Sequence, residues 1–297
     1  IKADFYIPEA RSLQAKHHDK VVVELVEWRA KDKNPIGKII EILGNAGSND
    51  IEMKSILIEN GFFTSFPKAV LDEADQLALE ISDEEKKLRR DFSKTPTFTI
   101  DPADAKDFDD AISIRKLEED LFEVGVHIAD VSHYVKEHSA MEKEAFKRAT
   151  SVYLVDRVAP MFPERLSNII CSLRPNEDKC CYAAVFKINS KAVVKETWFG
   201  RTVIHSKKRF TYEEAQEILE GKDGVFKEEL MQLNQLAHIL RRERFKNGSI
   251  GFEAPETKFQ LDEKGKPIGV YVKERKDAHL LIEDFMLLAN KAVATYI

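Results

Sequence analysis

Apolar and polar residues alternate along the first part of the chain, as in strands. Three such runs lie within residues 1–43, namely KADFYIP, DKVVVELVEW and PIGKIIEILG, and the turn-like segment RAKDKNPIG joins the last two. The spacing then becomes helical in IEMKSILIENG and in VLDEADQLALEI, which follows Pro67. Because a five-stranded OB-type barrel needs two more strands than these runs supply, we expect a partial barrel in residues 1–75.

A charged run, SDEEKKLRR, follows these helices, and we expect it to form a solvated linker helix within residues 76–94. Beyond Pro96 the runs TFTI, AISIRKL and LFEVGVHIAD alternate with turns. Two long segments further along have apolar stripes at helical spacing, over residues 227–246 and 277–297. Strands and helices in separate runs predict an α+β fold for the second domain, residues 95–297.

The composition is that of an ordinary globular protein, with 43% hydrophobic and 33% charged residues. A net charge of −6 argues against a basic surface over the whole molecule, so a polyanion would have to bind a local groove. Cys171, Cys180 and Cys181 show no CxxC or Cys/His zinc spacing, which predicts buried thiols in a reducing compartment. No apolar run approaches the ~18 residues of a membrane span, and we expect a cytoplasmic protein.

Five aspartates gather in the segment TIDPADAKDFDDAIS, residues 99–113: Asp101, Asp104, Asp107, Asp109 and Asp110. Carboxylates brought together repel one another unless a cation binds among them or one takes a proton. A solvated acidic loop is one interpretation; a calcium loop fits less well, because no register supplies the required Gly and Glu. Oxygen ligands without Cys or His favour Mg²⁺ or Mn²⁺. Asp107, Asp109 and Asp110 can share one ion only if the backbone turns here, since an extended strand would place them on both faces.

The string IDPADAKDFDDA resembles the first catalytic motif of the RNase II/RNase R exoribonucleases, the RNB family, with Asp101, Asp107, Asp109 and Asp110 at its acidic positions. The resemblance continues through blocks at 125–135, 149–179, 209–216 and 278–290. The segment before residue 95 resembles the second cold-shock-type domain of RNase R-like members. The resemblance implies a partial cold-shock barrel followed by the N-terminal part of an RNB catalytic domain, with a mixed sheet and flanking helices.

The same resemblance implies a hydrolytic exoribonuclease that degrades RNA from a free 3′ end and releases nucleoside 5′-monophosphates. Asp101, Asp107 and Asp110 would hold Mg²⁺, for which Mn²⁺ could substitute, and Asp109 would orient or deprotonate the attacking water. We expect a monomer that binds RNA and no membrane. A catalytically silent RNA-binding paralogue is the alternative, although the presence of all four aspartates speaks against it.

RNA-binding residues also follow from the resemblance. Tyr153 would stack on a base near the 3′ end, Tyr212 would lie against the sugar, and Glu283 would contact the terminal ribose. Phe259, or alternatively Phe252, would form the other side of the base clamp. Taken without the resemblance, the basic run that precedes Tyr212 is either surface decoration or a short nucleic-acid signal.

Two further expectations concern the limits of the chain and its histidines. A later family motif resembling S-P-x-R-R-Y-x-D, which supplies an arginine to the transition state, is absent before Ile297, and so is an S1-type domain. Ile1 is no initiator methionine, so we expect a fragment that is truncated inside the catalytic domain and inactive alone. His127 and His133 are expected to be hydrogen-bonded core or rim residues and not metal ligands.

Overall fold

The computed structural model describes residues 4–29, 31, 33–62, 64–251, 256–262 and 267–297. The chain divides into two compact units, of which the first comprises Ile1–Phe66, Arg148–Met161 and Phe259–Val270. The second comprises Pro67–Lys147, Phe162–Lys258 and Tyr271–Ile297. This division differs from the predicted one, because two segments distant in sequence join the N-terminal unit.

The centre of the first unit is an antiparallel pair of strands, β1 (Asp19–Glu27) and β2 (Ile36–Asn45), followed by helix α1 (Asn49–Glu59). The expected strand KADFYIP is reduced to one bridge between Tyr6 and Ile36, after which the chain turns into the 3₁₀ helix η1 (Glu9–Arg11). Pro8 has no N–H to donate to a ladder, which explains why the pairing stops there. The described residues of this unit form no closed barrel, as expected for a partial OB-type fold.

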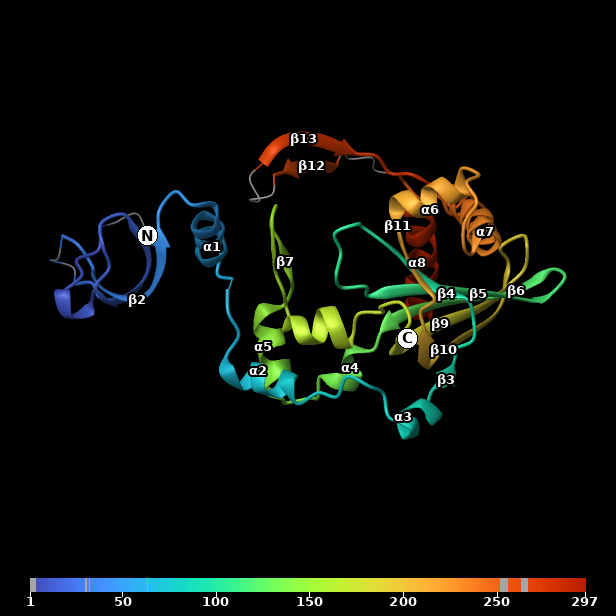
Figure 1. Cartoon of the computed structure of the whole chain (residues 1–297), viewed down its shortest axis with the longest axis horizontal. Helices are drawn as coiled ribbons and strands as arrows, with labels where there is room; N and C mark the ends of the chain where they lie inside the picture. The colour runs from blue at the N-terminus through green and yellow to red at the C-terminus, as the bar shows by residue number, and fades with distance from the viewer. Residues whose placement is uncertain (1–3, 30, 32, 63, 252–255, 263–266) are drawn as a thin grey trace. The chain divides into compact units, whose positions relative to one another are not determined.

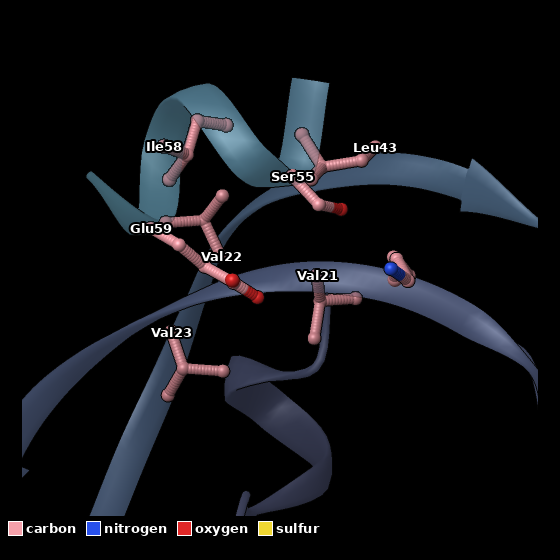
Figure 2. Close-up of a pocket in the computed structure, with 8 residues that line it drawn as sticks. Val21, Val22, Val23, Leu43, Ser55, Ile58 and Glu59 are labelled. Atoms are coloured by element: carbon pink, nitrogen blue, oxygen red, sulfur yellow. The ribbon is translucent and has the colours of Figure 1, made fainter. Parts of the chain in front are cut away.

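A pocket of about 350 Å³ opens between β1, the end of β2 and α1 (Figure 2). Its walls are mostly aliphatic, with one lysine and one glutamate among them. The lining residues are Lys20, Val21, Val22, Val23, Leu43, Ser55, Ile58 and Glu59. The pocket therefore combines aliphatic walls with two charged side chains.

Arg148 and Arg157 hold the segment Arg148–Met161 to the N-terminal part of the first unit, Arg157 through an ion pair with Asp50. The Arg148 guanidinium lies 3.7 Å from the centre of the Phe66 ring and donates hydrogen bonds to the carbonyls of Ser65 and Pro160. Between Arg148 and Met161, β7 (Val152–Tyr153) pairs with β8 (Val158–Ala159). Strands β12 (Glu256–Leu261) and β13 (Pro267–Lys273) form a separate two-stranded sheet.

The second unit is organised around a seven-stranded sheet in the order β11-β4-β5-β6-β9-β10-β3. The strands are β3 (Arg90–Asp91), β4 (Thr97–Asp101), β5 (Asp110–Glu118), β6 (Leu121–Ala129), β9 (Asp178–Ile188), β10 (Val194–His205) and β11 (Lys208–Thr211). The edge pairs β11–β4 and β10–β3 are parallel and the others antiparallel. The mixed sheet expected from the family resemblance is thus confirmed.

Three helices cover one face of this sheet: α6 (Tyr212–Leu219), α7 (Lys227–Lys246) and α8 (Asp277–Tyr296) (Figure 1). The stripe predicted on α7 is buried, with Leu230, Leu233 and Leu236 fully inaccessible to solvent. They pack with Phe98, Phe186 and other apolar residues of the strands in one core. Burying a leucine side chain contributes about 1.5 to 3 kcal/mol, so this core fixes the sheet that carries the aspartates.

Shorter helices complete the unit: α2 (Lys68–Asp75), α3 (Asp83–Lys87), α4 (Val131–Tyr134), α5 (Ala140–Arg148) and the π-helical turn η2 (Arg165–Ile170). The expected solvated helix in SDEEKKLRR is present over Asp83–Lys87, but the prediction fails at Arg89. Helix α3 covers only its first part, and Arg89 is buried where its guanidinium pairs with Glu85 at 2.7 Å and with Asp130 at 2.8 Å. The two carboxylates offset the cost of burying this charge. Within the described ranges, no helix is long and apolar enough to cross a membrane.

Candidate active site

The aspartate segment lies where two neighbouring strands of the sheet meet. Asp101 is the last residue of β4 and Asp110 the first of β5, and these strands pair antiparallel through Phe98 and Ile112. Both carboxylates therefore stand at the same end of the sheet. Between them the backbone leaves the extended conformation, with a turn closed by a bond of 3.1 Å from the N–H of Ala105 to the carbonyl of Pro102. This turn precedes Asp107, Asp109 and Asp110, so their sharing of one ion stays a prediction.

Hydrogen bonds from distant segments fix the shape of this loop. The Ser172 hydroxyl accepts from the N–H of Phe108 and donates to the carbonyl of Lys106, both at 3.0 Å. The N–H of Leu173 donates to the Phe108 carbonyl at 2.8 Å. Arg209 donates to the Pro102 carbonyl, and its guanidinium lies 5.4 Å from the centre of the Phe108 ring. Such supports hold the side chains of a loop in place without contacting substrate.

The carboxylates of this loop are held at high electrostatic cost. Burial, with a contribution from the Asp110 carboxylate, raises the pKa of Asp101 to about 6. Desolvation together with the Asp107 and Asp110 charges raises the pKa of Asp109 to about 6, and burial also raises the pKa of Asp110. In the absence of a cation the fold therefore disfavours the charged forms of all three groups.

The aspartates of this loop suit a hard cation, such as Mg²⁺, that keeps part of its water shell. The Oδ2 atom of Asp101 is buried and has no hydrogen-bond partner among the described residues. Within the described part of the chain, no three ligand atoms of the aspartate loop lie within 4.8 Å of one another. Mg²⁺ suits such a loose set because it is held by one or two carboxylates and keeps several waters.

Tyr212 reaches the aspartate end of the sheet because β11 lies parallel to β4. Thr211, the last residue of β11, pairs with Asp101 and caps helix α6, so Tyr212 follows at the first helical position. Burial and the nearby Asp110 and Asp101 charges raise the pKa of the Tyr212 phenol to about 12. The His279 ring of α8 stacks on it with centres 4.0 Å apart and planes 10° from parallel. Tyr212 was predicted from the sequence, whereas His279 was not, because its only signal was its position one turn before Glu283.

The acidic pair on α8 is neutralised by arginines. Glu283 pairs with Arg275, and an Arg244 nitrogen lies 3.8 Å from its other oxygen. Asp284 is buried and pairs with Arg241 at 2.8 Å and with Arg244 at 3.2 Å. Glu283 and Asp284 thus have structural partners, and the contact of Glu283 with ribose stays a prediction.

Tyr153 and Phe259 belong to the first unit, whereas the aspartates belong to the second. Both side chains are exposed, Tyr153 at the end of β7 and Phe259 in β12. Their placement against a base stays a prediction. The alternative clamp residue, Phe252, lies outside the described residues.

His127 has the structural role that was expected. Its ring is fully buried between the Ser113 hydroxyl, 2.9 Å from Nε2, and the Thr202 hydroxyl, 3.2 Å from Nδ1. Burial lowers its pKa to about 3, so the ring is neutral. The cysteines are free and buried, as predicted.

Comparison with protein families and known structures gives the same assignment over nearly the whole chain. The family model described as "RNB domain" matches residues 89–297, and the one described as "Cold shock domain" matches residues 1–67. A DIS3-like exonuclease 2 of Schizosaccharomyces pombe is 41% identical over 95% of this chain and 32% of its own length. A ribonuclease R of Thermotoga maritima is 40% identical over 99% of this chain and 42% of its own length.

Solved structures agree on the fold. Mycoplasma genitalium RNase R, in complex with ribose-methylated single-stranded RNA, superposes with a TM-score of 0.92 at 26% identity, covering 99% of this chain and 47% of that protein. Yeast Ssd1, described as a pseudonuclease, gives a TM-score of 0.71 at 18% identity, over 95% of this chain and 36% of that protein, which is a likeness of fold alone. The chain spans less than half the length of these relatives.

Proposed function

This chain belongs to the RNB family as an RNase R-like member, and from that premise we propose that the protein degrades RNA hydrolytically from its 3′ end, releasing nucleoside 5′-monophosphates. One observation carries the proposal: three carboxylates with raised pKa values gather at one end of the sheet, beside a half-buried tyrosine. Clustered groups with perturbed pKa values are typical of catalytic sites.

We infer that Mg²⁺ is the cofactor and that Asp101, Asp107 and Asp110 hold it, directly or through water. The support is the unused buried oxygen of Asp101 and the crowding of like charges. When bound, the ion supplies positive charge to polarise a water molecule and a phosphate oxygen. Mn²⁺ is the natural substitute because it favours the same oxygen ligands.

Asp109 is our candidate for positioning the water and accepting its proton. Its side chain retains access to solvent, and a pKa of about 6 leaves it ionised at neutral pH. A base whose pKa lies near the working pH is effective both as an ionised group and as a proton acceptor.

Three features are proposed to hold the 3′ end of RNA. The Tyr212 ring, fixed by its stacking on His279, would pack against a sugar. Glu283, which is held by arginines, would accept a hydrogen bond from the terminal ribose. Tyr153 and Phe259 expose aromatic rings suited to stacking on bases, an interaction that tolerates any sequence.

Digestion, by the full-length protein, of RNA labelled at its 3′-terminal nucleotide tests this function. The expected first product is the labelled nucleoside 5′-monophosphate, formed with Mg²⁺ and absent with a chelator. Labelled oligonucleotides as first products would indicate internal cleavage and contradict the proposal. RNA binding without any cleavage in Mg²⁺ or Mn²⁺ would favour the silent paralogue.

A further inference from the structure

A second set of potential metal ligands gathers away from the aspartate loop. It consists of Glu85 on α3, His133 on α4 and Cys180 on β9, whose ligand atoms all lie within 4.8 Å of one another. Among the described residues, no other group of three such side chains is this close. The three residues are far apart in sequence, so their meeting is a product of the fold.

The sheet order explains why they meet. Strand β9 lies between β6, which leads into α4, and β10, which pairs with β3 directly after α3. The N–H of Asp130 donates to the Cys180 carbonyl at 3.0 Å, which ties the start of α4 to β9. Arg89 donates to the Cys181 carbonyl at 3.2 Å and so ties the end of α3 to the same strand. A backbone hydrogen bond on one side and an arginine side chain on the other therefore position the cluster.

Hydrogen bonds orient the side chains around the cluster. Arg89 holds the Glu85 carboxylate at 2.7 Å, and the Nδ1 atom of His133 lies 3.5 Å from the same oxygen. Asp130 accepts a bond of 3.2 Å from the N–H of His133, and the Tyr134 hydroxyl contacts the Cys180 sulfur. Metal sites depend on outer partners of this kind to fix their ligands.

The donor set and the local charge both suit zinc. One sulfur, one imidazole nitrogen and one carboxylate oxygen are the ligand types that Zn²⁺ binds at about 2.0 to 2.3 Å, distances that require only a small contraction of the cluster. The Glu85 and Asp130 carboxylates exceed the buried positive charge of Arg89 by one, which favours a cation at this place. Arg201, 3.7 Å from Asp130, is half-exposed and screened by solvent. Zinc binding would also displace the proton of the Cys180 thiol.

We propose that Glu85, His133 and Cys180 bind one zinc ion, with water at the fourth position. The ion would fasten α3 and α4 to β9 and so stabilise the edge of the second unit. This site is independent of the exoribonuclease function: it uses different residues, different ligand types and a different class of metal.

Cobalt(II) tests the site directly, because a thiolate ligand gives Co²⁺ an intense charge-transfer band in the near ultraviolet that oxygen ligands do not. The metal-free protein is titrated with Co²⁺ under excess Mg²⁺, which occupies the aspartates. The variants are Cys180→Ser and His133→Asn, with Cys181→Ser and His138→Asn as matched controls. Cys181 is buried next to Cys180 in the same strand, and His138 is exposed.

The expected result is a band that saturates at one Co²⁺ per protein in the wild type and in both controls, and that Zn²⁺ abolishes. Cys180→Ser should lose the band. His133→Asn should weaken binding by more than the roughly 10- to 100-fold that outer-shell changes cause. Because His133 is on a short surface helix, this variant decides the question even if Cys180→Ser fails to fold. A wild type without the band, a band that persists in Cys180→Ser, or unchanged affinity in His133→Asn would overturn the proposal.

Discussion

Replacing Asp101 by asparagine is expected to stabilise the metal-free protein at neutral pH while destroying its response to Mg²⁺. The folded-state pKa of about 6, against 3.8 in the unfolded chain, means that the folded protein retains a proton that the unfolded chain has released. Stability therefore falls as the pH rises from about 4 to about 6, and the full penalty applies above that window. The free-energy penalty of ionising Asp101 in the folded protein is on the order of 3 kcal/mol, which is an upper limit for a partly hydrated group.

The assay is chemical denaturation of the second unit in chelator at pH 4 and pH 7.5. Asp101→Asn should be more stable than the wild type by up to about 3 kcal/mol at pH 7.5 and nearly equal to it at pH 4. Saturating Mg²⁺ should then stabilise the wild type, by about 2.7 kcal/mol at one hundred times the dissociation constant, and leave the variant unchanged.

Asp104→Asn is the matched control, because Asp104 is exposed in the same loop. Its effect on unfolding free energy should stay within about 0.5 kcal/mol at both pH values. An Asp101→Asn variant that is destabilised equally at pH 4 and pH 7.5 would refute the reasoning, since the carboxylate would then act through packing and not through its charge.

Two further predictions test the base clamp and the core. Tyr153→Ala should leave the initial rate on long RNA unchanged but release longer end products. The reason is that stacking worth about 1 to 3 kcal/mol matters most when few contacts with a short RNA remain. Wild-type end products on a gel would contradict this prediction. Leu233→Ala should destabilise the second unit by about 2 to 5 kcal/mol in urea denaturation, since the side chain is fully buried. A loss of unfolding free energy below about 1 kcal/mol would contradict the assignment of Leu233 to the core, because burying a leucine side chain contributes at least about 1.5 kcal/mol.

The parts of the fold that the sequence predicted best are those set by local periodicity. The stripe of α7 and the apolar α8 follow from helical spacing, and both helices lie over the expected residues. KADFYIP also looks periodic, but Pro8 ends its pairing after one bridge. The buried position of Arg89 has no local signal, because its partner Asp130 comes from a distant strand end.

The candidate site shows the same limit. Asp101 and Asp110 could be placed together because a short loop joins two predicted strands. His279 and Ser172 could not be linked to that loop, since the parallel pairing of β11 with β4 and long-range hydrogen bonds bring them there. The same holds for His133 and Cys180: we expected His133 not to be a metal ligand and found no zinc spacing around Cys180. Strand β6, which leads into α4, pairs with β9, and this pairing brings the two side chains together.

The central claim is that the aspartate loop performs catalysis, and the most direct test compares Asp109→Asn with Asp104→Asn in RNA cleavage and RNA binding by the full-length protein. The account predicts that Asp109→Asn lowers the cleavage rate by roughly 10² to 10⁴ while RNA affinity stays close to that of the wild type. Asp104→Asn should retain both. Near wild-type turnover in Asp109→Asn, or an equal loss in Asp104→Asn, would contradict the account.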